Sequence, residues 1–191
     1  MSNRKIKFID NAMVEYEILP LVDQYDPILR QPIEPLDFTK EHGKDVAYWI
    51  MSLIESCAHY HGLGLSANQV GISKRICAIN MLEEGKVYAL INPVIVDKSP
   101  TNSSYKEGCL SFPGLFLEVG RPEWVDIEFQ AANGEKVTKK FEGIWATCVQ
   151  HEMDHLDGKV FTSLVSPIKL DIAKRKVKQN LRKIRKVTTG V

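Results

Sequence analysis

The sequence has no apolar run that approaches the roughly 20 residues of a transmembrane helix, which argues against a membrane protein. Its first ten residues also lack the apolar core and small-residue cleavage site of a secretory signal, so we expect a cytoplasmic protein. Of the 191 residues, 44% are hydrophobic and 26% are charged, a balance typical of globular proteins rather than disordered chains. A chain of this length buries enough apolar surface to fold alone, so we expect a single domain over residues 1–191.

Closely spaced cysteine pairs are also absent. The four cysteines, Cys57, Cys77, Cys109 and Cys148, form no C-x-x-C pair, which excludes a zinc ribbon and the disulfide framework of a small secreted protein. Three of them lie among apolar residues, where we expect buried and unreactive thiols. Cys109 differs, because a glycine precedes it and Leu-Ser follows it.

The net charge of +1 hides an uneven distribution. The segment 168–191 contains nine Lys or Arg and one Asp, whereas the rest of the chain has more acidic than basic residues. Apolar residues recur through this segment at helical spacing, namely Ala173, Val177, Leu181 and Ile184. We therefore expect a basic amphipathic helix over Pro167–Val187.

Hydrophobic periodicity predicts two further helices. Apolar residues recur every three or four positions over Asp45–His61 and again over Ile144–Leu156, where Gly158 is placed to end the helix. The first 41 residues are broken by prolines, so we expect an irregular segment with at most short helices. The segment Gly62–Gly71 is rich in small residues and is interpreted as a loop that enters a strand.

Strand signals lie between the two helices. Two pairs of strands flank short turns, one at Glu83-Glu84-Gly85 and one at Ala132-Asn133-Gly134, whose Asn-Gly favours a tight hairpin. The expected strands are Arg75–Met81, Lys86–Val96, Trp124–Gln130 and Lys136–Phe141. The pattern predicts an α+β fold, in which mixed and mainly antiparallel sheets surround a central helix.

The segment Gln150–Gly158 carries the strongest chemical signal, the pattern His-Glu-Met-Asp-His. On a helix, His151 and His155 point from the same face, where both can bind one metal ion. Glu152 follows the first histidine and would lie near the ion without being a ligand, which suits a general base. Because the same pattern occurs in helices that bind no metal, a third ligand has to be found elsewhere in the chain.

No convincing third ligand follows His155. The only acidic residues after it are Asp157, on a different face of the helix, and Asp171, at the start of the basic segment. Upstream, Cys109 lies in the segment Glu107–Ser111, which we expect to be extended.

Three segments, Gly62–Gln69, Glu107–Ser111 and Gln150–Gly158, resemble in order and wording the three signature motifs of peptide deformylases. The resemblance extends over most of the chain, from about Asp26 to Leu164. It implies an enzyme that removes the formyl group from the N-terminal methionine of nascent polypeptides. It also implies that the central helix binds the metal.

The resemblance implies that Cys109, His151 and His155 bind one divalent ion. Iron(II) is the metal that the family suggests, although a thiolate with two imidazoles also suits zinc, nickel or cobalt. Glu152 would accept a proton from the attacking water and deliver it to the departing amine.

The resemblance also assigns residues around the substrate. The side-chain amide of Gln69 and the backbone N–H of Leu110 would stabilise the oxyanion. Gly62 and Gly64 would let a peptide pair with the loop backbone as an extra strand. The methionine pocket would include Leu63, Ile144 and Cys148, for which plain core packing is an equally good interpretation.

Two expectations concern supporting residues. Asp154 lies three residues after His151, so its carboxylate is expected to orient a ligand or to pair with Arg121. The basic segment 168–191 resembles a ribosome-docking extension of bacterial deformylases, because positive charge attracts RNA phosphates. A solvated face of an ordinary packed helix explains its charge equally well.

Two other functions remain open at this point. A zinc endopeptidase of the His-Glu-x-x-His type would use the same histidines and Glu152 but would not need Cys109. A ribosome- or RNA-binding protein with a structural metal would need four protein ligands, whereas the motif positions offer three.

Overall fold

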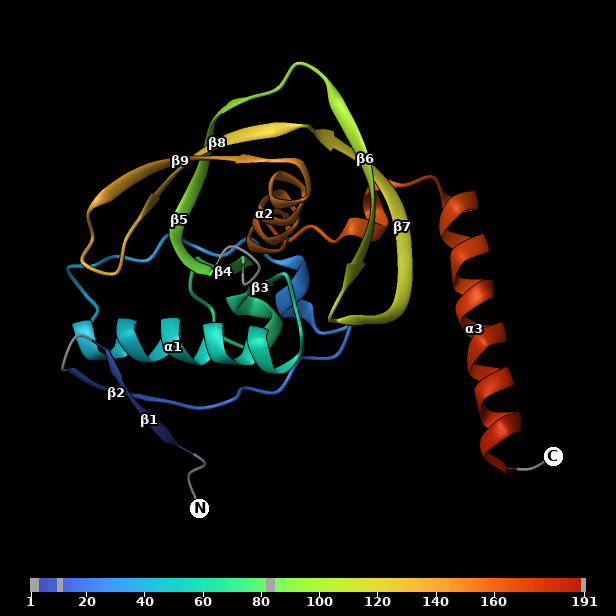
Figure 1. The fold of residues 1–191 in the computed structure, drawn as a ribbon, viewed down its shortest axis with the longest axis horizontal. Helices are drawn as coiled ribbons and strands as arrows, with labels where there is room; N and C mark the ends of the chain where they lie inside the picture. Colours follow the sequence, from blue (N-terminus) through green and yellow to red (C-terminus); the bar gives the residue numbers. More distant parts are fainter. Residues whose placement is uncertain (1–3, 10–11, 82–84, 190–191) are drawn as a thin grey trace.

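The computed structural model describes residues 4–9, 12–81 and 85–189. It combines helices with antiparallel strands, which confirms the α+β fold (Figure 1). The main sheet has five strands in the order β3-β4-β5-β8-β9, and every neighbouring pair is antiparallel. These strands are β3 (Gly64–Ser66), β4 (Ile76–Met81), β5 (Lys86–Lys98), β8 (Trp124–Gln130) and β9 (Lys136–Glu142).

One of the two predicted turns lies within the described residues. Gly134 has a φ of 84°, and its N–H donates to the carbonyl of Ala131 at 2.9 Å, so the hairpin between β8 and β9 is confirmed. The turn expected at Glu83-Glu84-Gly85 involves residues 83 and 84, which lie outside the described residues, although β4 and β5 pair on either side of it.

Helices pack on both faces of this sheet. Along β4, Cys77 and Ile79 contact the cluster around helix α2 (Gly143–Leu156), whereas Ile76 and Ala78 contact the cluster around helix α1 (Gly43–His59). This alternation follows from the two-residue period of a strand. α2 therefore lies at the centre of the molecule, as Figure 1 shows. Both helices match the predictions to within two residues at each end.

A separate two-stranded ribbon lies beside α2 (Figure 1). Its strands are β6 (Asn102–Cys109) and β7 (Phe112–Pro122), which pair antiparallel with an irregularity between Gly108 and Cys109. The ribbon buries one face against the 3-10 helix η4 (Phe161–Leu164) and the terminal helix α3 (Pro167–Thr189). It thus brings Cys109 to α2 across 42 residues of sequence, the separation between Cys109 and His151.

Helix α3 begins where the sequence predicts it, but its apolar stripe is only partly buried. Ala173 and Val177 pack on the ribbon, whereas Leu181 is 61% exposed. The helix continues past the end of the ribbon, as Figure 1 shows, so nothing covers this part of the stripe among the described residues. The side chain of Ile184 lies outside the described residues.

The prediction for the start of the chain was wrong in one respect. A hairpin of β1 (Lys5–Ile9) and β2 (Ala12–Tyr16) precedes the first proline and packs on α1, whereas only short helices were expected. The prolines begin at Pro20, so they could not break these strands. Farther on, the short 3-10 helix η1 (Pro27–Arg30) agrees with the prediction. No described helix is long and apolar enough to cross a membrane.

Candidate metal centre

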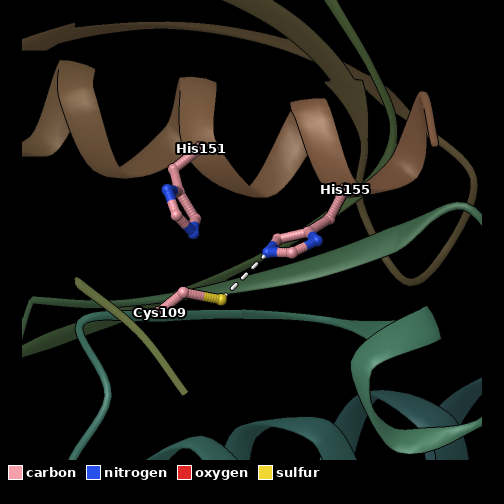
Figure 2. A group of neighbouring side chains, drawn as sticks. All are labelled: Cys109, His151 and His155. Atoms are coloured by element: carbon pink, nitrogen blue, oxygen red, sulfur yellow. Dashed lines mark hydrogen bonds between the residues drawn. The ribbon is translucent and has the colours of Figure 1, made fainter. Parts of the chain in front are cut away.

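Two structural elements bring three potential ligands together. α2 presents His151 and His155 from the same face, and the end of β6 places Cys109 opposite them (Figure 2). The three ligand atoms lie within 4.8 Å of one another, and the Cys109 Sγ is 3.2 Å from the His155 Nε2. The metal set expected from the sequence therefore forms one cluster.

The donor atoms fit a single ion. Metal–sulfur bonds of about 2.3 Å and metal–nitrogen bonds of about 2.0–2.1 Å place tetrahedral ligands roughly 3.3–3.7 Å apart. Small side-chain rotations would bring the observed donors to that spacing. Both histidines are buried, at 7% and 1% exposed, and Cys109 is partly exposed at the wall of a cavity. Three protein ligands and an open side are features of a catalytic metal site rather than a structural one.

The pKa values of the two imidazoles are shifted in opposite directions. Burial alone would lower the pKa of His151, but its interactions with Cys109 and Glu107 outweigh burial and raise the pKa to about 10. Burial and the neighbouring His151 lower the pKa of His155. Because both imidazoles must be unprotonated at the ligating nitrogen, a cation bound at this cluster would take the place of the proton.

A buried ion-pair network holds His151 in place. The His151 Nδ1 donates to Glu107 Oε2 at 2.8 Å, and Arg121 binds the same carboxylate at 2.5 and 3.1 Å. Arg121 also donates to Asp154 Oδ2 at 2.8 Å, which confirms the expected pairing of Asp154 with Arg121. Glu107, rather than Asp154, is the carboxylate that contacts His151. The sequence interpretation missed this contact. The position of Glu107 two residues before Cys109, on a strand with alternating side chains, is the signal that could have revealed it.

We predict that replacing Glu107 with Gln weakens metal binding by about 10–100-fold, the usual cost of losing a carboxylate that orients a ligand. Glu107 is expected to be ionised, because its hydrogen bonds from His151 and Arg121 outweigh burial and lower its pKa. Competition with a chelator would measure the affinity. The control is Glu118→Gln, which removes an exposed carboxylate from the same ribbon. Equal affinities of Glu107→Gln and the wild type would show that the network does not support the metal.

Gln69 is aimed at the cluster by a local cap. In the 3-10 helix η2 (Ala67–Val70), the backbone N–H and hydroxyl of Ser66 both donate to Gln69 Oε1, at 2.9 and 2.8 Å. This fixes the amide, so Nε2 lies 3.4 Å from Cys109 Sγ and 3.2 Å from Ser111 Oγ. The segment Gly62–Gly71 was interpreted as a loop that enters a strand, whereas the structure has a short strand, β3, followed by η2.

Glu152 lies beside the cluster at the cavity wall. Its side chain is 4% exposed, and its Oε2 has no hydrogen-bond partner in the described chain. Burial is the main cause that raises the pKa of Glu152 to about 7. Gly64 allows this arrangement, because a Cβ there would lie 2.6 Å from Glu152 Oε1 and 2.8 Å from Cys148 Sγ. A side chain at position 64 would therefore displace the carboxylate.

The cluster opens into a cavity of about 490 Å³. The residues expected to bind substrate all line it, as does Tyr105, to which the sequence interpretation gave no role. The expected residues are Gly62, Leu63, Gly64, Ile144 and Cys148, and Leu110 lies at its wall. Leu63 and Ile144 are each nearly half exposed, which disfavours plain core packing for these two, whereas Cys148 is buried and belongs to the core around α2.

A thiol and two imidazoles that can hold one ion, with a buried carboxylate at the wall of a largely apolar cavity, define the class of metal-dependent hydrolases. Comparison with known proteins narrows the class. The family model described as polypeptide deformylase matches residues 18–171. The peptide deformylase of Rhizobium meliloti is 36% identical over 165 residues, which cover 83% of this chain and 91% of the relative.

Solved structures agree. The crystal structure of a peptide deformylase from Legionella pneumophila matches with a TM-score of 0.77 and 30% identity, covering 88% of this chain and 98% of that one. A deformylase from Synechococcus elongatus, in complex with actinonin, matches with a TM-score of 0.76 and 34% identity, covering 84% and 86%. The chain therefore belongs to the peptide deformylase family. It is a metal-dependent hydrolase that removes the N-formyl group from nascent polypeptides.

Proposed function

We propose that Cys109, His151 and His155 bind the divalent ion of this enzyme, and that Glu152 is its general base. The observation that most supports this assignment is the convergence of the three donor atoms within 4.8 Å at the cavity wall. When bound, the ion supplies Lewis-acid activation of water and of the formyl carbonyl. The carboxylate of Glu152 then takes the proton of the attacking water and delivers it to the departing amine.

Two donors from this chain would stabilise the oxyanion that develops on the formyl oxygen. We assign them to the Gln69 side-chain amide and the Leu110 backbone N–H. Ser66 donates two hydrogen bonds to the amide oxygen of Gln69. The amide N–H groups of Gln69 are therefore directed toward the cluster. Because such a donor does not reorient during the reaction, each is typically worth about 10²–10³ in kcat.

The peptide would lie between Gly62–Gly64 and the end of β6, where it can hydrogen-bond to main chain as an added strand. The methionine side chain would enter the apolar part of the cavity beside Leu63, Ile144 and Cys148. Recognition through main chain tolerates varied sequences after methionine, as an enzyme that processes many nascent chains requires.

The proposed function is tested by formate release from formyl-Met-Ala-Ser with anaerobically purified protein. We propose iron(II) as the metal in the cell, and zinc, nickel and cobalt as ions that the same donors accept. Chelation is expected to abolish release, and iron(II) is expected to restore it without any cleavage of internal peptide bonds. Full activity of the metal-free protein would contradict the proposal.

We also propose that this enzyme meets its substrates in the cytoplasm, at the ribosome, through helix α3. The segment 168–191 carries nine Lys or Arg, and the described cations of α3 are exposed. Ala173 and Val177 pack against the ribbon, so we propose that residues 1–191 act as one domain and hold the basic face in a fixed place.

Neutralising part of α3 is expected to weaken ribosome binding. Replacing Lys178, Arg182 and Lys183 with Gln removes three exposed cations without touching the residues that pack on the ribbon. Because each phosphate contact releases counterions, both the co-sedimentation with ribosomes at low salt and its salt dependence should fall.

The matched control removes three exposed cations elsewhere, namely Lys40, Lys44 and Lys98. The control variant should co-sediment like the wild type. If the α3 variant does so as well, the docking role is wrong and the basic face is a solvated helix surface.

A further inference from the structure

The two faces of β6 carry different side chains at the cavity. Tyr105 and Glu107 alternate with Lys106 and Gly108, and the first pair is more buried than the second along the strand. All four residues line the cavity. The face that carries Glu107 approaches α2 and the metal cluster, so the face that carries Lys106 forms the outer rim.

An aromatic ring covers part of this rim. Phe116 on β7 pairs with Gly108, and a Cβ at position 108 would lie 2.6 Å from the Phe116 ring. The ring therefore lies directly on the glycine backbone, next to Cys109, and 53% of it remains exposed. Only glycine at position 108 permits this close approach of the ring to the strand.

Lys106 extends its ammonium over this ring. The Lys106 Nζ lies 5.3 Å from the centre of the Phe116 ring, within the range of a cation–π contact. Glu118 is the cross-strand neighbour of Lys106, yet the two form no ion pair. The cation is thus directed toward the cavity end of the strand, and it has no carboxylate partner among the described residues.

Lys106 supplies an exposed positive charge at this rim. Among the described residues that line the cavity, the carboxylates belong to Glu107 and Glu152, and both are buried. A peptide at this rim would therefore meet the Lys106 ammonium rather than either of those carboxylates.

We propose that Lys106 and Phe116 form a specificity ledge for the residue that follows the formylated methionine, and that this ledge favours a carboxylate side chain there. The inference rests on the proposed function. In an extended peptide, successive side chains point to opposite sides. When the methionine side chain enters the cavity toward α2, the next side chain points to the opposite face of β6, where Lys106 and Phe116 lie. The aliphatic part of a glutamate then packs on the ring, and its carboxylate meets the ammonium.

The test compares kcat/KM for three peptides with amidated C-termini, formyl-Met-Glu-Ser, formyl-Met-Gln-Ser and formyl-Met-Lys-Ser. Glutamate and glutamine have the same shape, so their ratio isolates charge. The wild type is expected to favour the Glu peptide over the Gln peptide by about threefold to fivefold, the effect of an exposed ion pair. The preference should shrink as ionic strength rises.

Two variants of Lys106 and one control complete the test. Lys106→Ala should bring the Glu/Gln ratio close to one, and Lys106→Glu should reverse the preference in favour of the Lys peptide. Lys98→Ala, which removes an exposed lysine that does not line the cavity, should keep the wild-type ratio. A wild-type ratio of one, or a ratio that Lys106→Ala does not change, would overturn the ledge alone. No formate release from any of the three peptides would overturn the proposed function, and the ledge with it.

Discussion

Glu152→Gln is expected to lower kcat on formyl-Met-Ala-Ser by about 10²–10⁴-fold, the usual contribution of a positioned general base, while one metal ion per chain is retained. Glutamine fills the same space beside Gly64, so the packing of the cavity wall should persist. It cannot accept a proton from water. The loss should therefore appear in kcat, with little change in the thermal stability or the metal content of the protein.

Formate release and metal analysis of the same sample would measure the effect of Glu152→Gln. The control is Glu142→Gln, which changes an exposed glutamate directly before α2 and should leave both quantities unchanged. A Glu152→Gln variant with wild-type kcat would place the base elsewhere. A variant without metal would show that this carboxylate supports the ion instead.

The second large effect is expected for Cys109→Ala. This substitution removes one of three ligands, so metal affinity should fall by more than the roughly 10–100-fold that loss of an orienting partner costs. Activity should fall with it. The substitution also separates this enzyme from a zinc endopeptidase of the His-Glu-x-x-His type, which would keep its metal and its activity without the cysteine.

A thiol-specific control is available for Cys109→Ala. Cys77 is buried in the core between the sheet and α2, so Cys77→Ala removes a thiol that no metal would reach. This variant should bind metal like the wild type and lose only stability. Metal retention by Cys109→Ala would contradict the proposed ligand set.

The parts of the site that lie within one element could be predicted from the sequence. The spacing of His151 and His155 fixes both imidazoles on one face of a helix, and the structure has that helix over Gly143–Leu156. The hairpin at Asn133-Gly134 is equally local, because the turn itself requires a positive φ that glycine adopts easily.

Features that depend on contacts between distant segments could not be derived in this way. Cys109 was assigned only through a resemblance, because its approach to α2 depends on how the β6–β7 ribbon packs. The contact of Glu107 with His151 was missed for the same reason: a carboxylate in a strand does not reveal its partner 44 residues later. The β1–β2 hairpin was missed because proline content was applied to residues that precede the first proline.

X-ray absorption spectroscopy of the zinc-loaded enzyme tests the proposed centre most directly, because it counts the ligand atoms around the ion. The spectrum is expected to show one sulfur at about 2.3 Å and two imidazole nitrogens at about 2.0–2.1 Å, with one further light atom from solvent. The sulfur should be absent from any zinc that Cys109→Ala retains. A wild-type spectrum without sulfur, or with a fourth protein ligand in place of solvent, would contradict the proposed centre.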